Sequence, residues 1–190
     1  MRLLFAFGSL GFALSSCSPV EEDAPPVVGV FTVESTLVAN GCGQGGLMIP
    51  AVTELEATVR GYPGNVAQFR WSGQATSANG IATTNGSYSF ETSSTSVAIQ
   101  AEPSIGYVGC QLTERTAMTF TLSPIPVEPG DAGVDGADAG VVDYTLDGRI
   151  TIDIVPVSGS DCSPLLGVNG GSWLAMPCQA TIDLAGSRDP

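Results

Sequence analysis

A period of two in the apolar residues recurs along most of the chain and constrains the fold more than any other feature. Segment 111–122 is a long example, with Leu112, Phe120 and Leu122 on one set of alternating positions. Such alternation places successive side chains on opposite faces of a β-strand. Convincing stretches of Ala, Leu, Glu and Lys at helical period are missing. The chain therefore predicts an all-β protein.

Turn signals divide the alternating segments into short strands. Asn79-Gly80 and Asn85-Gly86 are typical of tight hairpins, and segment 62–65 (Tyr-Pro-Gly-Asn) is typical of a turn. The strands we expect are 28–38, 52–60, 66–71, 81–84, 87–91, 96–101, 111–122, 144–157, 172–176 and 179–184. About nine or ten short strands at this spacing predict an antiparallel β-sandwich or barrel. Disulfides, for which the cysteines give the evidence below, are expected to cross-link it.

One segment interrupts the alternation without ending the domain. Residues 124–143 are rich in Pro, Asp, Gly and Ala, lack large side chains, and repeat Asp-Ala-Gly. The residues after this segment are too few to bury a core of their own. We therefore predict a single β domain over 28–186, with 124–143 as an exposed loop between two of its strands.

The N-terminus has the features of an export signal. Met1-Arg2 precedes an apolar run over 3–14 that is too short to cross a bilayer as a helix. The run ends in Leu14-Ser15-Ser16-Cys17, which resembles the lipobox of bacterial lipoproteins. An ordinary secreted protein with cleavage nearby is the alternative.

The resemblance carries several implications. It implies that 1–16 is a removed signal peptide and that Cys17 carries the acyl chains, so that a covalent lipid attaches the protein to the membrane. Ser18, in place of the aspartate associated with inner-membrane retention, implies the outer membrane, facing the periplasm or the cell surface. Segment 17–27 is acidic and proline-rich, which predicts a flexible tether.

The other four cysteines form an even set in an exported chain, which favours disulfides. They are Cys42, Cys110, Cys162 and Cys178. Phe-Thr-Val-Glu at 31–34 and Ile-Thr-Ile-Asp at 150–153 precede two of them in a similar way, and the residues that follow the other two are also alike. This internal similarity favours Cys42–Cys110 and Cys162–Cys178.

Composition excludes several classes of function. The net charge is −13, and the chain holds neither lysine nor histidine. Phosphate backbones should repel such a chain, so no nucleic-acid partner is expected. Activated serine or cysteine nucleophiles and Walker-type phosphate sites lack their essential residues. Because no Cys-x-x-Cys pair exists either, we expect neither a metal nor a cofactor.

Carboxylates are the remaining candidates for chemistry. Glu54 and Glu56 share one strand face about 7 Å apart, a separation that suits glycoside hydrolysis but equally describes two acids on a solvated face. The acidic series in the low-complexity loop comprises Asp131, Asp135, Asp138 and Asp143. It lacks the oxygen ligands that a calcium loop needs at Gly133 and Val142, so a solvated loop is favoured over weak calcium binding.

Aromatic side chains are the last candidates. Tyr62 and Trp173 lie beside turns and are the rings we expect to be exposed, although core packing accounts for the aromatic residues better than a ligand platform does. Altogether, the residues favour a non-catalytic cell-envelope lipoprotein that binds a protein or glycan partner through loops such as 40–50 and 124–143. A carboxylate-dependent polysaccharide hydrolase and a purely structural envelope protein are the alternatives.

Overall fold

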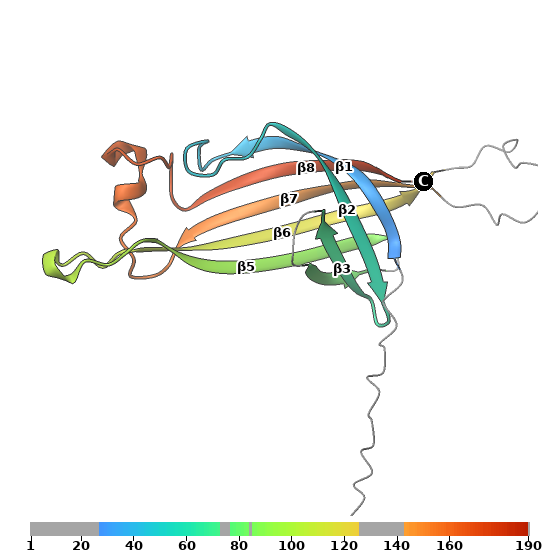
Figure 1. The fold of residues 1–190 in the computed structure, drawn as a ribbon, viewed down its shortest axis with the longest axis horizontal. Coiled ribbons are helices and arrows are strands. Elements are labelled where there is room, and N and C mark those ends of the chain that lie inside the picture. Colours follow the sequence, from blue (N-terminus) through green and yellow to red (C-terminus); the bar gives the residue numbers. More distant parts are fainter. Residues whose placement is uncertain (1–26, 73–76, 84, 126–142, 190) are drawn as a thin grey trace, which may run out of the picture.

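Eight antiparallel strands form the domain (Figure 1). The computed structural model describes residues 27–72, 77–83, 85–125 and 143–189. The strands are β1 (Val27–Asn40), β2 (Val52–Tyr62), β3 (Val66–Trp71), β4 (Ala78–Ala82), β5 (Ser87–Ile99), β6 (Cys110–Pro124), β7 (Tyr144–Pro156) and β8 (Cys178–Arg188). Three 3₁₀ turns lie in the loops: η1 (Pro103–Ile105), η2 (Ser163–Leu165) and η3 (Gly167–Asn169).

The strands pair in chain order, and β8 returns to pair with β1, so the sheet closes into a barrel. Closure is uneven along the strands, because β3 and β4 have 6 and 5 residues whereas β5 has 13. Only Tyr88–Phe90 of β5 pair with β4, while β5 follows β6 along its whole length. The barrel is therefore closed only at the end where β3 and β4 lie. Toward the other end, β5, β6, β7, β8 and β1 continue as an open sheet.

The two ends of the barrel carry different features. At the termini end, β1 begins at Val27, β8 ends at Arg188, and β6 leads out at Pro124. At the disulfide end, β1 leads to Cys42, and β6 and β8 begin at Cys110 and Cys178. Figure 1 shows the 3₁₀ turns at the end opposite the C-terminus.

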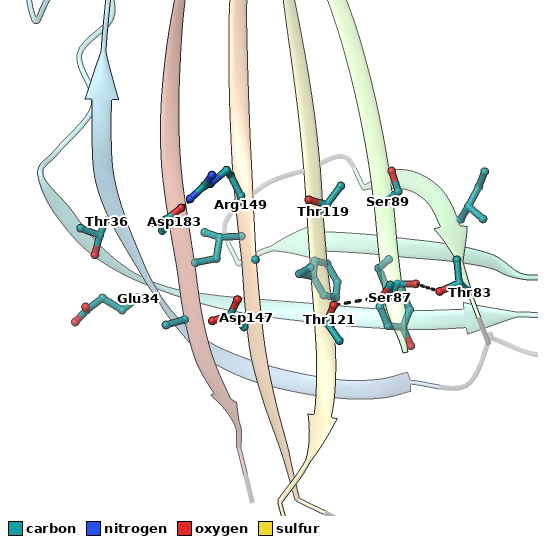
Figure 2. Close-up of a pocket in the computed structure, with 16 residues that line it drawn as sticks. Glu34, Thr36, Thr83, Ser87, Ser89, Thr119, Thr121, Asp147, Arg149 and Asp183 are labelled. Carbon is teal, nitrogen blue, oxygen red and sulfur yellow. Dashed lines mark hydrogen bonds and ion pairs between the residues drawn. The ribbon is translucent and has the colours of Figure 1, made fainter. Parts of the chain in front are cut away.

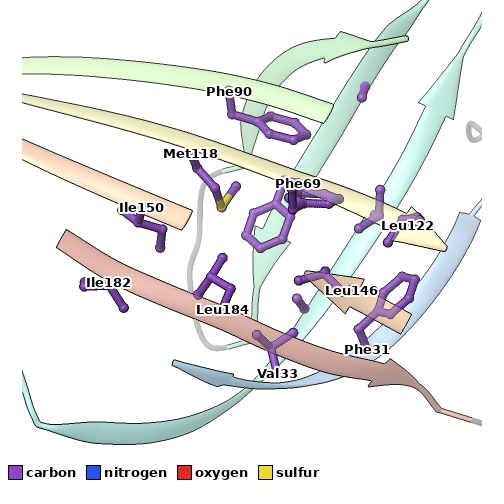
Figure 3. Close-up of a cluster of buried hydrophobic side chains, with 14 residues drawn as sticks. Phe31, Val33, Phe69, Phe90, Met118, Leu122, Leu146, Ile150, Ile182 and Leu184 are labelled. Carbon is purple, nitrogen blue, oxygen red and sulfur yellow. The ribbon is translucent and has the colours of Figure 1, made fainter. Parts of the chain in front are cut away.

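Apolar side chains fill the closed part of the barrel (Figure 3). Phe69 lies 5.7 Å, centroid to centroid, from both Phe90 and Phe120, and 4.6 Å from Trp71. Burying a large apolar side chain contributes about 1.5–3 kcal/mol, so this cluster is the main source of stability. The buried members are Phe31, Val33, Ala57, Val59, Ala67, Phe69, Phe90, Met118, Phe120, Leu122, Leu146, Ile150, Ile182 and Leu184.

A second apolar cluster lies at the disulfide end. Leu112 and Ile154 pack there with the buried cysteines, and Trp173 covers the cluster from the loop that follows β7. This cluster supports the part of the sheet that the short strands β3 and β4 do not reach.

The all-β prediction is confirmed, but the expected nine or ten strands are eight. The predicted strands 87–91 and 96–101 are one continuous strand, because the polar residues between them stay paired with β6. Segment 172–176 is not a strand: Trp173 forms one isolated bridge with Leu166. Alternation could not show either fact, since both depend on pairing partners.

One predicted hairpin is also wrong. Asn79-Gly80 lies inside β4, where a Cβ on Gly80 would come within 2.4 Å of the Phe90 ring. Glycine is needed there for the close approach of β5 and not for a turn. Asn85-Gly86 does turn the chain into β5, with Gly86 at φ 77°.

Candidate functional site

The candidate site is a wide depression on the outer face of the barrel, with a volume of about 850 Å³ (Figure 2). It crosses six strands, since β1, β4, β5, β6, β7 and β8 all contribute to it. Its lining consists of Glu34, Thr36, Ile81, Thr83, Ser87, Tyr88, Ser89, Thr119, Phe120, Thr121, Asp147, Gly148, Arg149, Asp183, Leu184 and Ala185. Hydroxyl and carboxylate groups dominate this list.

Strand register arranges the outward side chains in two cross-strand rows. Because every second residue of a strand faces outward, paired residues of the same parity become neighbours across the sheet. One row is Thr36, Asp183, Arg149, Thr119, Ser89 and Ile81, and the other is Glu34, Ala185, Asp147, Thr121 and Ser87. The rows place polar groups from residues as far apart in the chain as Glu34 and Asp183 on one surface.

An ion pair lies near the middle of the first row. Arg149 Nε donates to Asp183 Oδ1 at 2.8 Å, and both side chains are about half exposed, at 58% and 45%. The hydrogen bond to Asp183 raises the pKa of Arg149 above its ordinary value. Exposed pairs of this kind contribute only about 0.2–1 kcal/mol to stability, so the pair matters here chiefly because it orients the guanidinium and the carboxylate.

Hydroxyl groups form the other side of the depression. Ser87 Oγ and Thr121 Oγ1 are 3.3 Å apart, and Thr83 Oγ1 donates to the carbonyl oxygen of Ser87 at 3.1 Å. Each hydroxyl can both donate and accept, which gives the surface a mixed hydrogen-bonding character. Glu34 and Asp147 add two exposed carboxylates.

The two aromatic residues of the lining belong to the inward face of the sheet. Tyr88 and Phe120 stack on each other with centroids 5.0 Å apart, and Phe120 is buried in the core. Partial burial raises the pKa of Tyr88, with a smaller contribution from Tyr144. Recognition at this surface would therefore rest on hydrogen bonds and charge more than on ring stacking.

The disulfide pairing favoured by the sequence is wrong. Cys42 bonds to Cys178, with Cα atoms 5.0 Å apart, and Cys110 bonds to Cys162, with Cα atoms 4.8 Å apart. β1 pairs with β8, and the chain continues from this junction to the first bridge. β6 pairs with β7, and the loop after β7 leads to the second. Barrel closure decides the first bridge and the β6–β7 pairing the second, and the internal similarity reports on neither.

The carboxylate pair expected on one strand is present but lies away from the depression's lining. Glu54 and Glu56 are both exposed on β2. Glu54 is paired with Glu34, which does line the depression, so two like charges are direct cross-strand neighbours at its margin.

The acidic loop series lies mostly outside the described residues. Asp131, Asp135 and Asp138 are among the residues that the structure does not describe, and Asp143 is exposed, with Oδ1 accepting the backbone N–H of Tyr144 at 3.1 Å. Within the described ranges, no three His, Cys, Asp or Glu side chains gather into a group that could hold a metal ion.

Both rings expected to be exposed are half-buried. Trp173 packs on the disulfide-end cluster, and Gly46 lies against its ring, so close that a Cβ there would be 2.4 Å from Trp173 Cδ2. The Tyr62 hydroxyl faces Gln68 Oε1 at 3.4 Å. The Trp173 ring therefore covers the apolar cluster at the disulfide end.

The two loops expected to take part in binding are attached to the barrel at opposite ends. Segment 41–51 connects β1 to β2 at the disulfide end, whereas Pro124 is paired with Tyr144 at the termini end, where 124–143 leaves and re-enters the sheet.

The predicted lipidation residue, Cys17, lies outside the described residues, as does most of segment 17–27. Among the helices that the structure does describe, none combines the length and apolar character needed to cross a bilayer.

Comparison of this chain with protein families, curated proteins and solved structures finds no match. In the sequence, the only signal of Glu34, Asp147, Arg149 and Asp183 is an outward position on a strand. These positions form a cluster only when the strand register is known.

Proposed function

We propose that this protein is a lipid-anchored, non-catalytic binding module of the bacterial cell envelope, and that the outer-face depression binds a glycan. The observation that carries this proposal is the pair of cross-strand rows, in which hydroxyl, carboxylate and guanidinium groups lie together over six strands.

The chemistry of the lining favours a polyhydroxylated ligand. Sugar hydroxyls donate and accept hydrogen bonds, as the Ser and Thr hydroxyls of the depression do, and paired hydroxyls suit the two oxygens of a carboxylate. An apolar ligand would find little to bury against, since Ile81 is the main outward apolar side chain of the lining.

The negative charge of the depression limits which glycans it can bind. Glu34, Asp147 and Asp183 outnumber Arg149, and the whole chain carries a net charge of −13. Anionic polysaccharides and phosphorylated glycans should be repelled, so a neutral or cationic glycan is expected.

The experiment is a glycan array probed with the mature chain displayed on a multivalent support, because binding by hydrogen bonds without ring stacking is weak and needs avidity. We expect retention of neutral or amino-sugar glycans, lost in Asp147→Asn and Arg149→Gln. Arg115→Gln, an exposed arginine on the same face but outside the depression, is the matched control and should bind normally.

Mass spectrometry of the retained glycans separates binding from turnover. Unchanged glycans support the binding module. Shortened products that disappear in Glu54→Gln or Glu56→Gln would replace it with a carboxylate-dependent hydrolase. An array with no retained glycan would contradict the proposal.

A further inference from the structure

The strand β5 has an open edge over Glu91–Val97. Its pairing with β4 covers only Tyr88, Ser89 and Phe90, although β5 continues to Ile99. Within the described ranges, no other strand pairs with β5 on the side opposite β6. Figure 1 shows β5 as the outermost of the long strands toward the disulfide end.

The direction of the backbone groups on this edge follows from the hairpin before it. Thr83 N–H donates to the Ser87 carbonyl at 2.8 Å, so the backbone groups of Ser87 point toward β4. Alternate residues of a strand point their N–H and C=O to the same side. The backbone groups of Glu91, Ser93, Thr95 and Val97 therefore point away from β6, past the end of β4.

The edge is held in the extended conformation that another strand needs for pairing. β5 pairs with β6 from Ser87 to Ile99, with Thr95 Oγ1 and Thr113 Oγ1 3.1 Å apart across the pair. β6 itself begins at Cys110, which is fixed by its disulfide to Cys162. A partner strand would meet a preformed template, so little ordering is needed on this side.

Apart from the charge of Glu91 at its start, the usual protections of an edge strand are missing from this stretch. Natural edges carry lysine, proline or a bulge that discourages pairing. Segment 91–97 reads Glu-Thr-Ser-Ser-Thr-Ser-Val, and the irregularity in register comes only between Val97 and Ile99. Small hydroxyl side chains leave the backbone accessible while keeping the edge polar.

A depression lies directly beside this edge on the outer face, with a volume of about 510 Å³. Glu91 and Asp153 contribute carboxylates to it, and Arg115 contributes one guanidinium. An outward side chain of an added strand would lie over this depression. Because the chain as a whole carries −13, a lysine or arginine there is favoured.

We propose that the β5 edge binds an extended basic segment of another protein by strand addition, with a lysine or arginine side chain over the depression beside Glu91. Backbone hydrogen bonds to Glu91, Ser93 and Thr95 give the affinity, and the depression gives the specificity. This interaction is independent of glycan binding on the other depression.

The chain's own remaining segments are poor occupants. Segment 18–26 and segment 126–142 both contain prolines, which cannot donate to a ladder, and both carry acids but neither lysine nor arginine. A second copy of the chain would bring a second Glu91 and the same net negative charge.

The test uses the mature chain and two synthetic peptides, each about nine residues long to match the edge. In one, Lys alternates with Val; in the other, Glu replaces Lys. Calorimetry should detect binding of the Lys peptide alone. Equal binding of the Glu peptide, or no binding of either, would overturn the proposal.

Variants of the edge identify the surface. Ser93→Pro/Thr95→Pro removes two N–H donors that point away from β6, so no hydrogen bond to β6 is lost. It should weaken binding of the Lys peptide about tenfold or more. Ser93→Ala/Thr95→Ala keeps both donors and should bind as the unaltered chain does. Full binding by the proline variant would overturn the proposal.

Two further measurements test the proposal, the first of them without depending on the folding of the proline variant. Amide hydrogen exchange of the unaltered chain should slow at Glu91, Ser93 and Thr95 when the Lys peptide is added, even if the proline variant does not fold. Unchanged exchange at these amides would overturn the proposal. Sedimentation that shows a dimer, lost in the proline variant, would assign the edge to a second copy instead.

Discussion

Individual glycines permit the close approach of neighbouring strands in the closed part of the barrel. A Cβ on Gly148 would come within 2.5 Å of both the Phe120 Cβ and the Thr119 carbonyl oxygen. Neither atom is the end of a flexible side chain, so β7 would have to move away from β6. Since Phe120 belongs to the core, this movement would disturb the packing around Phe69.

We therefore expect Gly148→Ala to lower the free energy of unfolding by about 1–3 kcal/mol, the usual cost of overpacking. Urea denaturation of the two chains measures it. The matched control is Gly167→Ala, where the nearest neighbour of the new Cβ would be the Trp173 carbonyl oxygen at 3.5 Å. Equal stability of the two variants would contradict the assigned role of Gly148.

At the scale of strands, the disulfides join neighbours in the closed sheet. Cys42–Cys178 connects the first strand to the last across 136 residues, whereas Cys110–Cys162 spans 52. Both lie at the disulfide end, where the short strands β3 and β4 do not complete the wall. The bridges thus cross-link the sheet at the end that β3 and β4 do not reach.

Removing either bridge should destabilise the protein by an amount set by loop length. Chain entropy gives about 5 kcal/mol for Cys42→Ala/Cys178→Ala and about 4 kcal/mol for Cys110→Ala/Cys162→Ala. Urea midpoints of the two double variants, compared with the intact protein, check both the size and the order. A larger loss for the shorter loop would mean that local packing around Cys110 outweighs chain entropy.

At the scale of the whole molecule, the two ends of the barrel have separate roles in our proposal. The chain enters β1 at the termini end, so a lipid on Cys17 would place this end toward the membrane. The disulfide end and the open part of β5 would then face away from it. Both proposed binding surfaces lie on the outside of the barrel wall, where a membrane below the termini end leaves them accessible.

The lipid anchor is tested by metabolic labelling with an alkyne fatty acid. We expect the label on the intact protein and none on Cys17→Ala, which should also leave the membrane fraction because its anchor is missing. A label retained in Cys17→Ala would place acylation elsewhere and remove the orientation argued above.

Much of the architecture could be predicted from local patterns. Alternation predicts β1, β3 and β6 to within two residues at each end. Asn85-Gly86 predicts the turn that leads into β5. The strand expected over 144–157 is β7, which ends at Pro156, a residue with no N–H to donate to the sheet. These features depend on side-chain period and on backbone preferences of single residues, which a sequence displays directly.

Features that depend on which strands meet were beyond local patterns. Cys42 and Cys178 are joined because β1 pairs with β8, and Arg149 meets Asp183 because β7 and β8 pair in one particular register. The free edge of β5 exists because β4 is shorter than its neighbour. Side-chain period specifies a strand and its two faces, but closure, register and the matching of strand lengths are long-range properties that emerge only when the whole sheet is assembled.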